Sequence, residues 1–145
     1  MKTLATIAFF LGTSFLNSSS RAELQWYTLE EAQALMNTEP RKVFIDIVAD
    51  WCKWCKVMEK ETFTNPEVIA YIETHYYPVR MDYESQDSVM FQGKATTYKA
   101  LAYDWKVRDL PAIIFWDEGF DGKFLSTGYK NGPDFLKDLQ AFNAF

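Results

Sequence analysis

The residues best suited to chemistry are the two cysteines of this 145-residue chain, Cys52 and Cys55. A bridge across two intervening residues closes a very small loop and removes little entropy from the unfolded chain, so a purely stabilising disulfide explains the pair poorly. On the first turn of a helix, this spacing brings the sulfurs within bridging distance. The unpaired amides and positive dipole at the helix N-terminus favour a thiolate there. The pair therefore predicts redox chemistry, with Cys52 as the nucleophile and Cys55 as the resolving thiol.

A metal site is the other use for closely spaced cysteines. Zinc needs four protein ligands in a structural site, and besides the cysteines the chain offers only one histidine, His75. We therefore predict no zinc site, and no bound cofactor is expected because a dithiol itself carries the electrons. Copper(I), which binds soft thiolate ligands, leaves metal delivery open as an alternative.

The residues around the cysteines favour a large partner. Trp51 and Trp54 place apolar surface beside the pair, while Lys53 and Lys56 add positive charge. This composition suits the docking of a protein or peptide better than that of a small polar substrate. The whole chain carries a formal net charge of -5 and shows no basic stripe, which argues against nucleic-acid binding.

Asp46 is the one polar residue in the apolar, β-branched run 43–48, a pattern typical of a strand buried on both faces. A buried carboxylate is costly unless it stays protonated or finds a partner. Lying six residues before Cys52, Asp46 could sit beneath the cysteines and exchange a proton with Cys55. The alternatives are an ion pair with a nearby lysine or a position at a sheet edge.

The rest of the chain predicts an α/β fold in which helices flank a central sheet of parallel and antiparallel strands. Capping signals at Thr28, Asn65 and Asn131 mark three helix starts. Polar, irregular sequence over 83–93 predicts a loop or short insertion. The expected helices cover 29–37, 52–61, a segment from 65, 96–105 and a segment from 131, and the expected strands cover 43–48, 77–82, 112–116 and 124–128.

The N-terminus predicts a cleaved signal peptide over 1–22. A positive start at Lys2 precedes an apolar stretch over 4–16, and small residues flank Arg21 where a signal peptidase would cut after Ala22. The apolar stretch is shorter than the roughly 20 residues that span a bilayer, although an uncleaved anchor remains an alternative. We therefore expect one domain over 23–145, exported to the periplasm or an equivalent space.

The segment 45–56 resembles the active-site segment of the thioredoxin superfamily. That family carries a buried aspartate six residues before the first cysteine, which Asp46 matches. It also carries a cis-proline opposite the dithiol, and Leu110-Pro111 occupies that place ahead of the predicted strand 112–116. The stretch 56–68 looks like the exported branch that includes the C-terminal domain of Dsb-type transmembrane thiol–disulfide interchange reductases.

This resemblance implies a thioredoxin fold and a protein-disulfide reductase in which Asp46 accepts the proton of Cys55. It implies protein or peptide disulfides as substrates. Because an exported reductase must be recharged, we predict a membrane-embedded electron donor as partner, and we expect a monomer. The residues expected to contact the substrate are Trp51, Lys53, Trp54, Leu110 and Pro111.

Two departures from the family leave alternatives open. The spacer is Lys53-Trp54 where thioredoxin proper has Gly-Pro, so the reduction potential does not carry over and an oxidase or isomerase on the same fold stays possible. Leu110 is bulky and apolar at a position that contacts peptide in relatives, so substrate preference does not carry over either. A chaperone or binding module whose cysteines form only a structural clasp is a further, non-enzymatic alternative.

Overall fold

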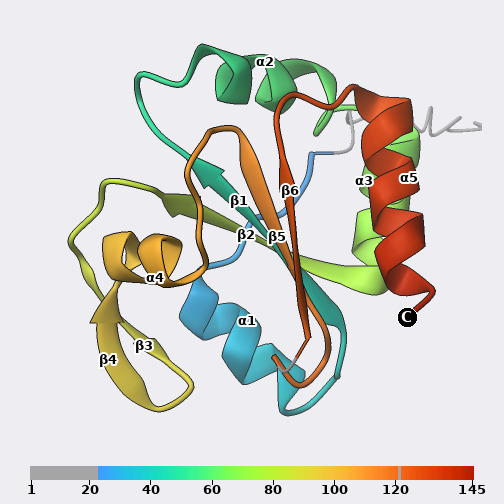
Figure 1. The fold of residues 1–145 in the computed structure, drawn as a ribbon. Coiled ribbons are helices and arrows are strands. Elements are labelled where there is room, and N and C mark those ends of the chain that lie inside the picture. Colours follow the sequence, from blue (N-terminus) through green and yellow to red (C-terminus); the bar gives the residue numbers. More distant parts are fainter. Residues whose placement is uncertain (1–22, 121) are drawn as a thin grey trace, which may run out of the picture.

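The computed structural model describes residues 23–120 and 122–145, so the predicted signal peptide lies outside the described residues. The chain forms the predicted α/β fold, a mixed sheet flanked by helices (Figure 1). Its elements follow in the order α1 (Leu29–Met36), β1 (Lys42–Val48), α2 (Lys53–Glu61), α3 (Pro66–His75), β2 (Tyr76–Asp82), β3 (Ser88–Phe91), β4 (Lys94–Thr97), α4 (Tyr98–Asp104), β5 (Ala112–Trp116), β6 (Lys123–Thr127) and α5 (Gly132–Asn143).

The main sheet has the strand order β2-β1-β5-β6, with β1 parallel to β2 and antiparallel to β5. Alternate residues of β1 enter two different cores, because successive side chains of a strand point to opposite faces. Ile45 packs in the core shared with α1 and α4, and Phe44 packs in the core shared with α3 and α5. Figure 1 shows these helix pairs on opposite faces and α2 across the end where β1 finishes. The chain therefore leaves β1 at the end of the sheet that α2 covers, and it enters α2 after a short turn.

Side-chain caps start three helices where the sequence predicts them. Thr28 and Glu31 form the reciprocal capping box of α1. The side chain of Asn65 caps α3, with Pro66 in the first turn, and the side chain of Asn131 caps α5. Each such cap contributes on the order of 1 kcal/mol, which explains why these boundaries follow from local sequence.

The prediction of an irregular segment over 83–93 is wrong in part. The chain there forms an antiparallel hairpin, β3–β4, and α4 begins at Tyr98. Gln92 and Gly93 both adopt positive φ at its turn (48° and 75°), as tight hairpins require. The side chain of Gln33 on α1 donates to the Met90 carbonyl at 2.7 Å and accepts from the Gln92 amide at 2.9 Å. Contact with α1 therefore stabilises strands too short to be conspicuous in sequence.

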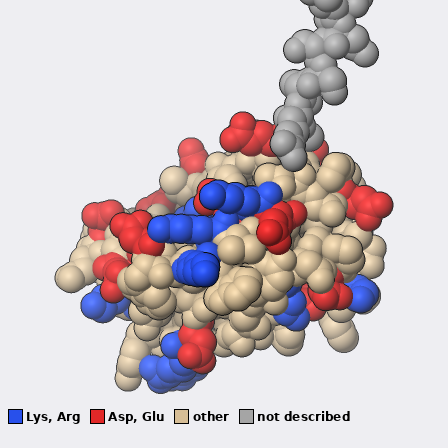
Figure 2. Space-filling view, turned by 90° about the horizontal axis from the view of Figure 1, so that it is seen from above, with Lys and Arg blue, Asp and Glu red and all other residues tan. Residues whose placement is uncertain are grey.

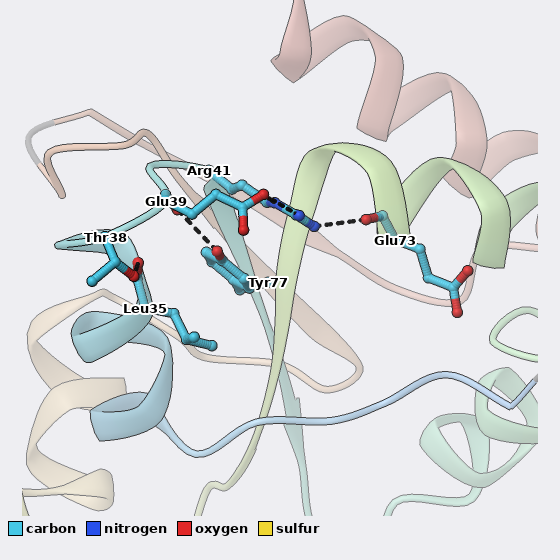
Figure 3. A network of polar contacts seen from close by, with 6 residues as sticks. All are labelled: Leu35, Thr38, Glu39, Arg41, Glu73 and Tyr77. Atoms are coloured by element: carbon cyan, nitrogen blue, oxygen red, sulfur yellow. Dashed lines mark hydrogen bonds and ion pairs between the residues drawn. The ribbon is translucent and has the colours of Figure 1, made fainter.

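A polar network closes the end of the sheet where β1 begins, opposite to α2 (Figure 3). Arg41 forms an ion pair with Glu39 and donates to the Glu73 carbonyl at 2.7 Å. The hydroxyl of Tyr77 donates to the Glu39 carbonyl at 2.9 Å. These bonds join the α1–β1 connection to α3 and β2, and so fix the far end of the strand that leads to the cysteines.

Candidate active site

Cys52 and Cys55 lie where β1 passes into α2. After β1 the chain turns so that the Cys52 amide donates to the Ala49 carbonyl at 3.0 Å, and Cys52 becomes the N-cap of α2. Its sulfur accepts a hydrogen bond from the Cys55 amide at 3.1 Å. The two cysteines form a disulfide with their Cα atoms 5.3 Å apart. The structure thus places the pair on the first turn of a helix, as the spacing predicts.

Both cysteines are covered by other side chains in this oxidised state. Cys52 is 3% exposed and Cys55 5%. Leu110 and Tyr83 pack against them. Tyr83 was missed because it opens the segment predicted as a loop. It immediately follows β2, the parallel neighbour of β1, and its amide donates to the Val48 carbonyl at 2.8 Å. Residues that directly follow parallel strands lie at the same edge of the sheet. The position of Tyr83 after such a strand could therefore have predicted its place beside the cysteines.

The exposed side chains at the site are those flanking and separating the cysteines. Trp51 is 63% exposed and Trp54 53%, large values for indoles. Figure 2, which views the end of the molecule covered by α2, shows lysine and arginine side chains gathered in a group bordered by acidic ones. Exposed lysines on α2 belong to this face. The segment that carries the disulfide therefore exposes two indoles and the positive charge of Lys53 and Lys56.

The chain returns to the cysteines at Leu110-Pro111, directly before β5. The peptide bond between these residues is cis. The Leu110 side chain packs against the cysteine cluster, and the Pro111 carbonyl accepts a hydrogen bond from the Gly128 amide at 2.9 Å. Leu110 is thus brought to the dithiol by β5, the antiparallel neighbour of β1.

Asp46 is buried in β1, 2% exposed, and it has an ion partner that sequence reasoning missed. Arg80 lies opposite it in the β1–β2 register, and its Nε is 3.2 Å from Asp46 Oδ2. A second nitrogen of Arg80, Nη1, is 2.7 Å from Glu59 Oε1 on α2. The partner is therefore an arginine and not a lysine. The sequence signal available was an arginine flanked on both sides by apolar residues, Val79 and Met81.

These surroundings bring the pKa of Asp46 close to neutrality. Its pKa is raised from 3.8 to about 6, with burial as the largest cause; the charge and hydrogen bond of Arg80 oppose the rise and the Glu59 carboxylate adds to it. A carboxyl group with such a pKa exchanges protons readily near neutral pH, as general acid–base chemistry requires. The burial of Asp46 thus gives it the property that the predicted role needs.

A surface pocket of about 360 Å³ lies between Cys55 and the charged partners of Asp46, although Asp46 itself does not line it. Cys55 lines it together with Lys56, Glu59 and Arg80. Glu59 and Arg80 also line a neighbouring pocket of about 410 Å³, where the Arg80 guanidinium lies 4.0 Å from the ring centroid of Trp26. The pocket therefore places Cys55 beside the two residues that hold and tune the Asp46 carboxyl.

Within residues 23–120 and 122–145, no cluster of three or more His, Cys, Asp or Glu side chains has an arrangement that could hold a metal ion. The helices of the same part of the chain are all too short or too polar to cross a bilayer.

Curated relatives and solved structures resemble this chain. It is 30% identical over 122 residues to the thiol:disulfide interchange protein DsbD of Photorhabdus laumondii, covering 81% of this chain and 18% of that protein. It is 33% identical over 89 residues to the DsbD of Escherichia coli, covering 59% of this chain and 14% of that protein. The chain therefore spans less than a quarter of the length of these relatives.

The structural neighbours share the fold at low sequence identity. A structure described as DsbH oxidoreductase matches with a TM-score of 0.67 at 18% identity, covering 96% of each chain. The oxidised C-terminal domain of Neisseria meningitidis DsbD matches with a TM-score of 0.59 at 18% identity, covering 81% of this chain and 98% of that one. The fold is therefore the thioredoxin fold. A family model described as a thioredoxin-like domain matches residues 29–143, and the chain belongs to that family.

Proposed function

We propose that this chain is an exported thiol–disulfide oxidoreductase that reduces disulfides in proteins or peptides. The observation that carries the proposal is the Cys52–Cys55 disulfide at the N-cap of α2, with Leu110 packed against the cysteines. The similarity to proteins named for thiol:disulfide interchange supports the same class of reaction. Neither cysteine needs a cofactor, because the dithiol supplies both electrons.

Reduction begins from the dithiol form. The Cys52 thiolate, favoured by its place at the N-terminus of α2, attacks one sulfur of the substrate disulfide and displaces the other as a thiolate. The Cys55 thiol loses its proton and attacks the Cys52 sulfur of the resulting mixed disulfide. The second substrate sulfur leaves as a thiolate, and the enzyme is left with the Cys52–Cys55 bridge that the structure holds. Two electrons pass from the dithiol to the substrate.

Asp46 is the proposed acceptor of the Cys55 proton. Its pKa of about 6 leaves it largely ionised at neutral pH, yet close enough to neutrality to release the proton again. The pocket that Cys55 shares with Arg80 and Glu59 supplies room for water between the thiol and the charged group. Arg80 holds the Asp46 carboxylate through its Nε.

Substrate binding falls to the surface around the dithiol. The exposed indoles of Trp51 and Trp54 offer apolar contact, and Lys53 offers positive charge. Leu110 and Pro111 would receive the backbone of the substrate chain on the other side of Cys52. A folded protein or peptide can contact both sides together, which a small disulfide cannot.

An exported reductase must be reduced again after each turnover. We propose that a membrane-embedded thiol donor does so and that the chain works as a monomer. We further propose that residues 1–22 direct export to the periplasm or an equivalent space, leaving 23–145 as the working domain. The relatives named for thiol:disulfide interchange support a thiol-containing redox partner, and the signal-like sequence at the N-terminus supports export.

The experiment measures disulfide reduction and its direction. Wild type should catalyse reduction of insulin by dithiothreitol, while Cys52→Ala should show only the uncatalysed rate. Thermal unfolding of both proteins confirms that the variant is folded. Equilibration with glutathione then gives the reduction potential, expected nearer to about −270 mV, typical of reductants of this fold, than to about −120 mV, typical of its strong oxidants. A wild-type protein without activity would refute the assignment as an oxidoreductase. A reduction potential near that of the strong oxidants would assign it as an oxidase instead.

A further inference from the structure

Tyr129 lies against the active-site helix although it comes from a distant part of the chain. It belongs to the connection between β6 and α5. The centroid of its ring is 5.2 Å from that of Trp54, with the planes inclined at 46°. Its hydroxyl donates a hydrogen bond to Glu61 Oε2 at 2.8 Å. Tyr129 therefore contacts both the first and the last turn of α2.

The helix geometry explains how one side chain makes both contacts. Trp54 and Glu61 are seven residues apart, which is close to two turns, so their side chains project from the same face of α2. The Tyr129 ring lies along that face. The indole is thus packed against a tyrosine whose hydroxyl is itself held by Glu61, and it remains 53% exposed.

The segment that carries Tyr129 is fixed at both of its ends. Gly128, with φ of 85°, donates its amide to the Pro111 carbonyl at 2.9 Å. The Thr62 hydroxyl donates to the Lys130 carbonyl at 2.6 Å from a fully buried position. The segment therefore links the Leu110-Pro111 side of the site to the end of α2, and Tyr129 is held in place between these two anchors.

We propose that Tyr129 is a positioning residue for substrate binding, which holds the exposed indole of Trp54, the residue before Cys55, in one orientation. This inference rests on the proposed function, and it assigns the recognition of protein substrates to a preformed aromatic surface. Without Tyr129 the indole must be ordered when the substrate binds, and ordering a mobile side chain weakens affinity. The free energy that one aromatic pair typically contributes corresponds to a rise in KM for a protein disulfide of about 2- to 10-fold in Tyr129→Ala. The effect falls on KM and not on kcat.

The kinetic test compares three variants in insulin reduction. Tyr129→Ala should raise KM, while Tyr129→Phe, which keeps the ring against Trp54, should stay within about twofold of wild type. Tyr103→Ala removes another exposed tyrosine, on α4, and is the matched control. The double variant that carries both Tyr129→Ala and Trp54→Ala should have a KM no higher than that of Trp54→Ala alone. Additive losses, or a Tyr129→Ala protein with wild-type KM, would overturn the proposal.

A spectroscopic test separates this inference from the proposed function. The protein is labelled with 5-fluorotryptophan and observed by fluorine NMR. The resonance of Trp54 is assigned from its loss in Trp54→Phe. Tyr129→Ala should shift or broaden that resonance and leave the resonance of buried Trp105 unchanged. If wild type fails to reduce disulfides, the proposed function fails while this signal still reports on the indole. An unchanged Trp54 resonance would show that Tyr129 does not position it.

Discussion

The burial of Asp46 makes a quantitative prediction about stability. Folding raises its pKa from 3.8 to about 6, so the folded state favours the protonated carboxyl. A group with a raised folded-state pKa contributes its full stability below pH 3.8 and loses that contribution as the pH rises through 6. The shift corresponds to about 3 kcal/mol in total, of which about 2 kcal/mol falls between pH 4 and pH 7.5.

The perturbation is Asp46→Asn, an amide of nearly the same shape that does not titrate. Urea unfolding of the oxidised protein at pH 4 and pH 7.5 gives the free energy of unfolding for each variant. The free energy of unfolding of Asp46→Asn minus that of wild type should be about 2 kcal/mol more positive at pH 7.5 than at pH 4. Comparing the two pH values cancels any constant effect of the altered contact with Arg80.

Glu73→Gln is the matched control, because Glu73 is an exposed carboxylate on α3. Its change in the free energy of unfolding should differ by less than about 0.5 kcal/mol between the two pH values. A difference for Asp46→Asn that is as small as this, or of the opposite sign, would refute the claim that burial sets the pKa of Asp46.

Three further predictions concern the site and the fold. Arg80→Met removes a hydrogen bond to a charged group, so the pKa of Asp46 should rise by about 1–2 units and the pH profile of insulin reduction should move upward. An unmoved profile would contradict the coupling. Leu110→Ala uncovers Cys52, so the reduced variant should be alkylated severalfold faster by iodoacetamide at pH 7; an equal rate would mean that Leu110 does not shield the sulfur. Thr28→Ala removes a capping hydrogen bond of α1 and should lower the free energy of unfolding by about 1 kcal/mol, measured in urea. No loss would show that the cap contributes nothing.

The features that the sequence predicts correctly are those with local causes. The start of α2 at the first cysteine follows from the spacing of Cys52 and Cys55, and the starts of α1, α3 and α5 follow from capping side chains within four residues of the helix. The buried strand β1 follows from a run that is apolar except for Asp46. In each case the energy that fixes the element comes from residues close in the chain.

The features that the sequence misses depend on register and on packing between distant segments. Arg80 meets Asp46 only because β1 and β2 pair in one particular register. The burial of Cys52 depends on Leu110 and Tyr83, which arrive on other strands. Tyr129 reaches Trp54 from the end of β6, an edge strand that β5 separates from β1. No local pattern encodes these pairings, so they emerge only when the sheet is assembled.

The claim that Cys52 is the nucleophile of a thiol–disulfide oxidoreductase is tested most directly by trapping. Reduced Cys55→Ala is mixed with a protein that contains a disulfide, quenched with acid and analysed by mass spectrometry, with Cys52→Ala treated identically. Cys55→Ala should accumulate a mixed disulfide through Cys52, because no resolving thiol releases it. Cys52→Ala should accumulate none. Equal adducts in the two variants, or none in Cys55→Ala, would contradict the assignment.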